Sequence, residues 1–247
     1  MISCATSASP ILVLCCAEER VQVVLGTSSE LLFAEEMLCP GQSIRHLPMA
    51  MDRALKSRGL GAKNLAGIAC VRGPGSFTGL RIAHAAMYGL ARPAGLPMAG
   101  LEYHAVLARQ IPTPARHEVW IATHARKGQV YLRGFIQEQP LDDIKPMAVT
   151  EAARLLVSRQ APRLVAGSGA RRNPELGELA ECPLLPVNFD TPAPMTLLQA
   201  ALDATFSEHA PTPLYLRKSD AEDNLEAIAL SRGIPVADAR RHIFDFE

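Results

Sequence analysis

The sequence predicts an α/β protein made of two related lobes. Its 247 residues are enough for one large domain or for two lobes. Hydrophobic residues make up 48% of the chain, and apolar runs alternate with turn-rich segments, as in globular proteins that mix strands with helices. The same order of predicted elements, a hairpin, a helix, a strand and a glycine turn, occurs once in each half.

The first lobe is predicted to begin with a three-stranded meander. The runs "ILVLCC", "VQVVLG" and "LLFAEEML" are the strands, and the polar turn "AEER" joins the first two. A helix follows over residues 43–57 and ends near Gly59, because apolar residues recur there at helical spacing. These residues are Ile44, Leu47, Met51 and Leu55. "LAGIACV" predicts a buried strand, and residues 78–91 predict a helix that leads to the short strand "PMAGL".

The second half repeats this order. "EVWIATH", the turn "ARKG" and "QVYLRGF" predict a hairpin, "VTEAARLLVSR" a helix, and "RLVAGSGA" a strand with a glycine turn. We therefore expect one lobe over residues 11–104 and another over 105–218. Residues 1–10 are expected to be a flexible tail. Residues 219–247 are expected to be a helical tail that opens with a capping box at Ser219 and Glu222.

The overall charge disfavours a protein that binds nucleic acid by itself. Lys plus Arg equal Asp plus Glu at 25 each, whereas neutralising phosphates needs an excess of cations. The six cysteines lack CxxC spacing and lie mostly in apolar runs, where a reduced cysteine behaves as a small hydrophobic residue. No apolar segment reaches the ~20 residues that span a bilayer. We expect a cytoplasmic protein without a membrane segment.

The stretch "RGPGSFTGLR" is the candidate functional loop. Its residues of interest are Gly73, Pro74, Gly75, Ser76, Phe77, Thr78, Gly79 and Arg81. A glycine turn between a strand and a helix can bind an anion through backbone N–H groups, and Ser76 or Thr78 could cap the helix. The stretch is not a Walker A loop, because Leu80 and Arg81 follow Gly79. A structural turn, an anion-binding or nucleotide-binding loop and a partner-contact loop all stay open from the residues alone.

The helix after this loop has two apolar faces. One face contains Leu80, Ala83, Met87 and Leu90, and the other contains mostly small residues, Ile82, Ala85, Ala86 and Gly89. A helix that is apolar on most sides is covered on most sides. It is either central within its own lobe or part of a subunit interface made by helices.

These segments closely resemble the TsaB (YeaZ) family over residues 11–222. The loop "RGPGSFTGLRI" carries most of the resemblance, with support from "LPMAMDRAL", "ARKGQVYLRGF", "VAGSGA" and "PLYLRKSDAE". The resemblance implies an actin-like (ASKHA) fold with ribonuclease H-like lobes. It also implies a noncatalytic role in forming threonylcarbamoyladenosine in tRNA, a role that needs no cofactor.

The resemblance also implies partners and an interface. The partners are a related catalytic subunit of the TsaD type and a TsaE-type ATPase, with homodimers when the protein is alone and with tRNA reached only through the complex. The interface falls on the two helices over residues 43–57 and 78–91. Its predicted residues are Ile44, Leu47, Met51, Ile82, Ala85, Ala86 and Gly89.

Several positions depart from the family pattern, and two of them lie where actin-like ATPases keep a carboxylate for the metal-phosphate site. Cys15 and Cys16 stand in place of an Asp-Thr pair, His124 and Ser168 stand where Asp is usual, and Gln42 replaces a His. An ATPase needs carboxylates to hold Mg²⁺ and to orient water. The sequence therefore disfavours ATP or ADP binding. An actin-like phosphotransferase or ATPase with a degenerate site is the alternative function.

Other chemistries find little support. No two of the seven histidines are three, four or five residues apart, so the helical His pair of a zinc protease is missing and no metal site or catalytic residue is predicted. Cys15 and Cys16 are expected to point to opposite faces of a strand and to pack in the core. Six charged residues are expected to be solvated, namely Glu18, Glu19, Glu35, Glu36, Arg171 and Arg172. For the two arginines, a contact with phosphate or tRNA is the alternative.

Overall fold

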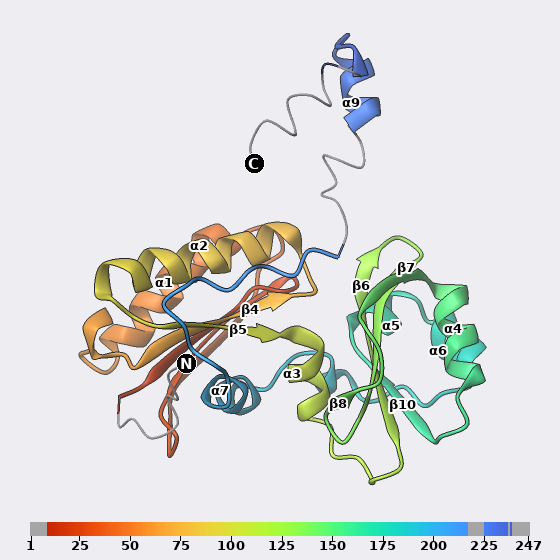
Figure 1. Ribbon diagram of the computed structural model, residues 1–247, viewed down its shortest axis with the longest axis horizontal. Helices are drawn as coiled ribbons and strands as arrows, with labels where there is room; N and C mark the ends of the chain where they lie inside the picture. Colours follow the sequence, from red (N-terminus) through yellow and green to blue (C-terminus); the bar gives the residue numbers. More distant parts are fainter. Residues whose placement is uncertain (1–8, 217–224, 237, 239–247) are drawn as a thin grey trace. The chain divides into compact units, whose positions relative to one another are not determined.

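The computed structural model describes residues 9–216, 225–236 and 238. The chain divides into two units, residues 1–214 and 215–247 (Figure 1). The second unit contains helix α9 (Leu225–Ser231). Most of the predicted N-terminal tail and the predicted capping box at Ser219 and Glu222 lie outside the described residues.

The first sheet has five strands in the order β3-β2-β1-β4-β5. Their bounds are Ile11–Cys15 (β1), Arg20–Gly26 (β2), Leu31–Leu38 (β3), Gly67–Gly73 (β4) and Met98–Glu102 (β5). The pairs β1–β2 and β2–β3 are antiparallel, which confirms the predicted meander, and β4 and β5 join β1 in parallel. The connections supply α1 (Ser43–Lys56), the 3₁₀ turn η1 (Ala62–Asn64) and α2 (Phe77–Ala94).

Strand β1 separates two hydrophobic cores. Successive side chains of a strand point to opposite faces. Leu12, Leu14 and Cys16 therefore pack on the side of α1 and α2, and alternate residues including Cys15 pack on the other side. This confirms the expectation for the two cysteines. Burial raises the pKa of Cys15 to about 12, so its thiol stays protonated and unreactive at neutral pH.

The second sheet repeats the mixed pattern of the first. Its order is β10-β6-β7-β8, and β9 also pairs with β7. The bounds are Glu118–Arg126 (β6), Gln129–Ile136 (β7), Gln139–Pro140 (β8), Lys145–Ala148 (β9) and Arg163–Ala166 (β10). Strands β6 and β7 form an antiparallel hairpin, and β10 joins β6 in parallel. Helices α4 (Val149–Ser158), α5 (Ser168–Arg172) and α6 (Glu175–Ala180) pack on this sheet.

The hairpin turn of the second sheet is tighter than predicted. The four-residue turn "ARKG" was expected, but β6 extends through Arg126 and only Lys127 and Gly128 remain as the turn. Gly128 has a φ of +72°, a left-handed conformation that glycine adopts without steric cost.

After the second sheet, the chain packs again against the first sheet. Helices α3 (Tyr103–Arg109) and α7 (Pro194–Leu202) pack in the core beneath β1, and a 3₁₀ turn η2 (Val187–Phe189) precedes α7. Farther along, the N–H of Leu214 donates to the carbonyl of Arg72 at 2.7 Å. A single boundary in the sequence does not describe this path.

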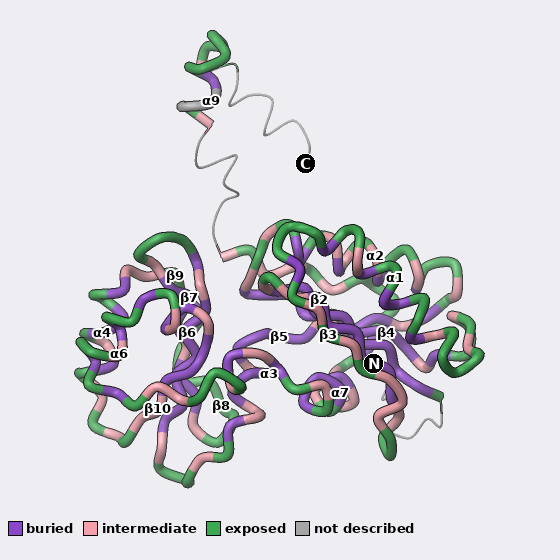
Figure 2. Tube along the Cα trace, turned by 180° about the vertical axis from the view of Figure 1, so that it is seen from behind, coloured by how far each residue is buried: buried purple, intermediate pink, exposed green. Residues whose placement is uncertain are grey.

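The two mixed sheets have the actin-like (ASKHA) architecture that the resemblance implies. Figure 2 shows that β1, β2, β4 and β5 of the first sheet are mostly buried, whereas the edge strand β3 and the helices α1 and α2 carry exposed residues. None of the described helices is both long and apolar enough to cross a membrane.

Candidate functional site

The glycine loop joins β4 to α2. Gly73 ends the strand with a φ of +127°, a backbone conformation that glycine adopts without steric cost. Ser76 caps α2, because its Oγ accepts the N–H of Gly79 at 3.2 Å. Of the two candidate caps, the structure therefore uses Ser76 and not Thr78.

The loop packs directly against the end of β1. The N–H of Ser76 donates to the carbonyl of Ala17 at 2.5 Å. A Cβ on Gly75 would collide with that same carbonyl, and a Cβ on Gly79 would collide with the carbonyl of Cys16. These glycines allow two backbones to approach closely, and the N–H groups of Ser76 and Gly79 are engaged within the chain. The N–H groups of Ser76 and Gly79 are therefore not available to an anion.

The residues around this loop do not fit a metal–nucleotide group. Cys15 and Cys16 are buried in the two cores. Ser168 Oγ accepts the N–H of His124 at 3.3 Å and donates to a carboxylate oxygen of Glu18. Within the described part of the chain, no cluster of three His, Cys, Asp or Glu side chains is arranged to hold a metal ion.

All but one of the charged residues that were expected to be solvated form ion pairs, and Glu19, Glu36 and Arg172 are also exposed. Arg171 pairs with Asp190 at 2.7 Å and Arg172 pairs with Glu19 at 2.9 Å, so neither arginine offers an uncompensated cation to a phosphate. Elsewhere, Glu35 pairs with Arg53, and Glu36 pairs with Arg20 at 2.5 Å. Glu18 is half-buried. The expectation of solvated charge was wrong for Glu18, because its turn contacts a segment 150 residues away.

A groove of about 360 Å³ lies between α1 and α2. Its lining residues are Pro48, Met51, Asp52 and Leu55 from α1 and Ala86, Gly89 and Leu90 from α2. Apolar side chains are exposed on the same two helices, with Ile44 70% exposed, Met49 52% and Tyr88 47%. An apolar surface of this kind marks a candidate protein interface.

The predicted interface residues divide into two groups. On α2, Ala85 and Gly89 are exposed, and Ile82 and Ala86 are half-buried. On α1, Ile44 is exposed, but Leu47 and Met51 are buried in the core of their own lobe. Pro48, Asp52 and Leu55 also line the groove, although the sequence did not predict them as interface residues. They continue the helical spacing from Ile44, and spacing alone does not say which stripe of a helix faces the sheet.

Gly89→Ala is expected to stabilise the protein. No atom lies within 4 Å of a Cβ built at this position, and alanine in a helix interior is more stable than glycine by about 0.5–1 kcal/mol. Urea unfolding should show a higher midpoint with an unchanged slope. A lower midpoint would mean that the groove is already filled in the isolated protein.

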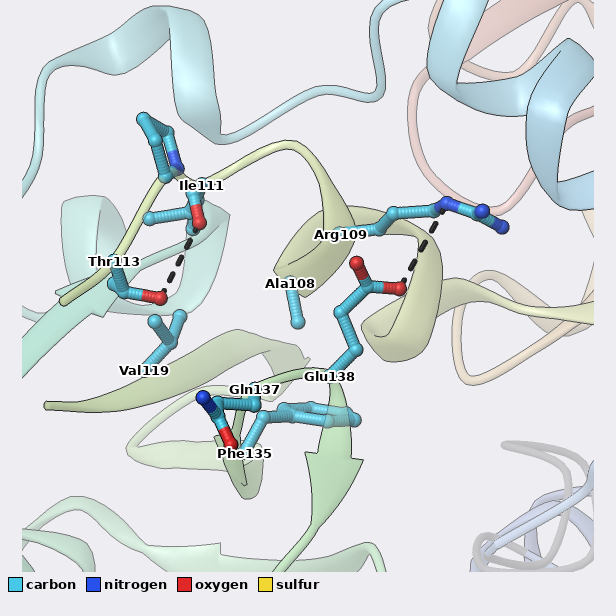
Figure 3. Close-up of a pocket in the computed structure, with 9 residues that line it drawn as sticks. Ala108, Arg109, Ile111, Thr113, Val119, Phe135, Gln137 and Glu138 are labelled. Atoms are coloured by element: carbon cyan, nitrogen blue, oxygen red, sulfur yellow. Dashed lines mark hydrogen bonds and ion pairs between the residues drawn. The ribbon is translucent and has the colours of Figure 1, made fainter. Parts of the chain in front are cut away.

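A second cavity of about 280 Å³ lies at the end of α3 (Figure 3). Its apolar lining includes Ala108, Ile111, Val119 and Phe135, and its polar lining includes Arg109, Thr113, Gln137 and Glu138. Arg109 lies 3.8 Å from Glu138 and 2.5 Å from Asp203. Its charge is thereby compensated, and the cavity shares no residue with the glycine loop or the groove.

The sequence comparisons connect this architecture with tRNA modification. Residues 40–209 match the family model of TsaD, described as tRNA N6-adenosine threonylcarbamoyltransferase. The chain is 30% identical over 200 residues to the tRNA threonylcarbamoyladenosine biosynthesis protein TsaB of Escherichia coli K12, an alignment that covers 74% of this chain and 84% of the relative.

Solved structures show the same fold. YeaZ from Pseudomonas aeruginosa superimposes with a TM-score of 0.68 at 24% identity, over 84% of this chain and 100% of that one. The ethanolamine utilization protein EutJ from Carboxydothermus hydrogenoformans gives a TM-score of 0.50 at 10% identity, over 78% and 91% of the two chains. From the family match and the extent of the alignment with TsaB, this chain belongs to the TsaB (YeaZ) family of tRNA threonylcarbamoyladenosine biosynthesis proteins, which is related to TsaD.

Proposed function

We propose that this protein is a noncatalytic scaffold in the formation of threonylcarbamoyladenosine in tRNA. It binds a TsaD-like catalytic subunit through the outer surface of α1 and α2 and keeps that subunit in its active arrangement. The same surface forms a homodimer when the partner is absent. A TsaE-like ATPase belongs to the assembly, and tRNA is reached only through the complex.

The groove between α1 and α2 is the observation that carries this proposal. Ala86 and Gly89 have little or no side chain, so a partner helix could approach the backbone of α2 closely. Exposed Ile44, Met49 and Tyr88 on the same helices supply apolar area. A specific interface buries at least about 1,000 Å² and has an apolar centre with a polar rim. The exposed charged residues of α1, including Arg45 and Asp52, would form part of that rim.

The proposal of a noncatalytic role is supported by the residues that follow the loop helix. The matched family model describes the transferase, and the resemblance implies that transferases of this type hold a metal with a His pair just after the loop helix. This chain has only His104 in that region. His104 is buried, its Nε2 lies 2.7 Å from Thr123 Oγ1, and burial lowers its pKa to about 3. A lone neutral imidazole in the core is poorly suited to metal catalysis.

Co-expression with the TsaD-like protein of the same genome tests the proposal. The two chains should co-purify as a complex whose mass by light scattering is a whole-number combination of both. The isolated chain should give about twice its mass of 26.6 kDa. Because the net charge is zero, the isolated chain should not shift tRNA in a gel. Purification of the TsaD-like protein without this chain would contradict the proposal.

A further inference from the structure

The turn between β1 and β2 reaches across to the second lobe. One carboxylate oxygen of Glu18 accepts the hydroxyl of Ser168 at the start of α5, and the other accepts the hydroxyl of Tyr103 on α3 at 3.1 Å. The next residue, Glu19, pairs with Arg172 of α5 at 2.9 Å. Two neighbouring carboxylates of one turn thus bind the same short helix.

The hydroxyl of Ser168 extends this connection into the second sheet. It accepts the N–H of His124, on β6, at 3.3 Å. Tyr103 is buried at the junction of β5 and α3. A single carboxylate therefore connects the turn of the first sheet with α3, α5 and β6. Hydrogen bonds to a charged acceptor are stronger than those between neutral groups.

One position that departs from the family pattern, Ser168, makes this contact possible. An aspartate at position 168 would place a second negative charge beside Glu18, and like charges at contact distance repel. Serine donates a proton instead. Burial raises the pKa of Glu18, while the bonds from Ser168 and Tyr103 and the charge of Arg172 act in the opposite direction. The carboxylate of this half-buried residue is thus compensated by the partners that it contacts.

We propose that Glu18 is a built-in anion that latches the two lobes together. It takes the place that the charged groups of a bound ligand have in an actin-like ATPase, so the lobes of this protein are held in one arrangement without a nucleotide. The proposal that Glu18 replaces a bound ligand is independent of the proposed scaffold role, because it rests only on contacts within the chain.

Hydrogen exchange with chemical rescue tests the latch. In Glu18→Ala, amides of residues 16–20 and 167–172 should exchange at least about tenfold faster, as expected for the loss of hydrogen bonds to a charged group. Added sodium acetate should restore much of this protection, because its carboxylate can enter the space left by the side chain. Sodium chloride at equal ionic strength should not. Glu30→Ala, which removes an exposed carboxylate from the β2–β3 turn, is the matched control and should change nothing in these segments.

A second pair of variants separates the latch from general destabilisation. Ser168→Ala should also accelerate exchange, and acetate should not rescue it because the carboxylate is still present. Ser168→Asp should accelerate exchange further through repulsion. Exchange of the β4 amides reports global unfolding. If Glu18→Ala loses the protection of these amides, Ser168→Ala is the variant that tests the latch. Unchanged exchange in Ser168→Ala and Glu18→Ala, or equal rescue of both by acetate, would overturn the proposal.

Discussion

Ala86→Arg is expected to abolish self-association and to weaken binding of the TsaD-like subunit by at least about 100-fold, the loss typical of an unpaired charge in an interface centre. Ala86 is half-buried and lines the groove between α1 and α2. An arginine there would fill the groove with a charged side chain that a partner helix would have to desolvate. The one carboxylate that lines the groove, Asp52, already pairs with Lys56 at 2.8 Å.

The fold should survive this substitution, because position 86 lies at the surface of the lobe. Circular dichroism and thermal unfolding would verify that point before binding is measured by light scattering and calorimetry. Val157→Arg on α4 is a matched control, since Val157 is an exposed apolar residue of a different helix. Unchanged assembly of Ala86→Arg would show that another surface makes the interface.

Gly75→Ala is expected to lower the free energy of unfolding by about 1–3 kcal/mol or more, the range for overpacking of a filled site. The added methyl would collide with the carbonyl of Ala17. That carbonyl cannot easily move, because it accepts the N–H of Ser76 at 2.5 Å. The start of α2 would shift or the loop would separate from β1.

Gly89→Ala serves as the internal control for this experiment. Both substitutions add one methyl group, but only position 75 meets backbone atoms. Urea unfolding should give opposite signs for the two changes. If Gly75→Ala were as stable as the natural protein, the loop would not be packed against β1. An open loop whose N–H groups could bind an anion would then be supported.

Local patterns in the sequence predicted most of the first lobe. The meander, the strand before the glycine loop, and the helices α1 and α2 on either side of that strand in the sequence appear where apolar spacing placed them. Strand alternation also predicted that Cys15 and Cys16 lie in different cores. These features depend on residues close together in the chain, so periodicity reports them directly.

Short helices were missed. Helices α3 and α7 have seven and nine residues, too short for a periodic signal to stand out. No side chain caps the N-terminus of α7, so Pro194 at its first position is the start signal that the sequence offers there. The return of residues 194–214 to the first sheet depends on the path of the whole chain.

The sequence by itself determined the family, the antiparallel meander of the first lobe and the apolar character of α1 and α2. Tertiary structure alone decided which stripe of each helix is exposed, why Gly75 and Gly79 are glycines, and where the carboxylate of Glu18 binds. The physical reason is distance along the chain. Amphipathic spacing encodes which faces of an element are apolar, but contacts such as Gly75 with Ala17, or Glu18 with Ser168, form only when segments 58 and 150 residues apart are brought together.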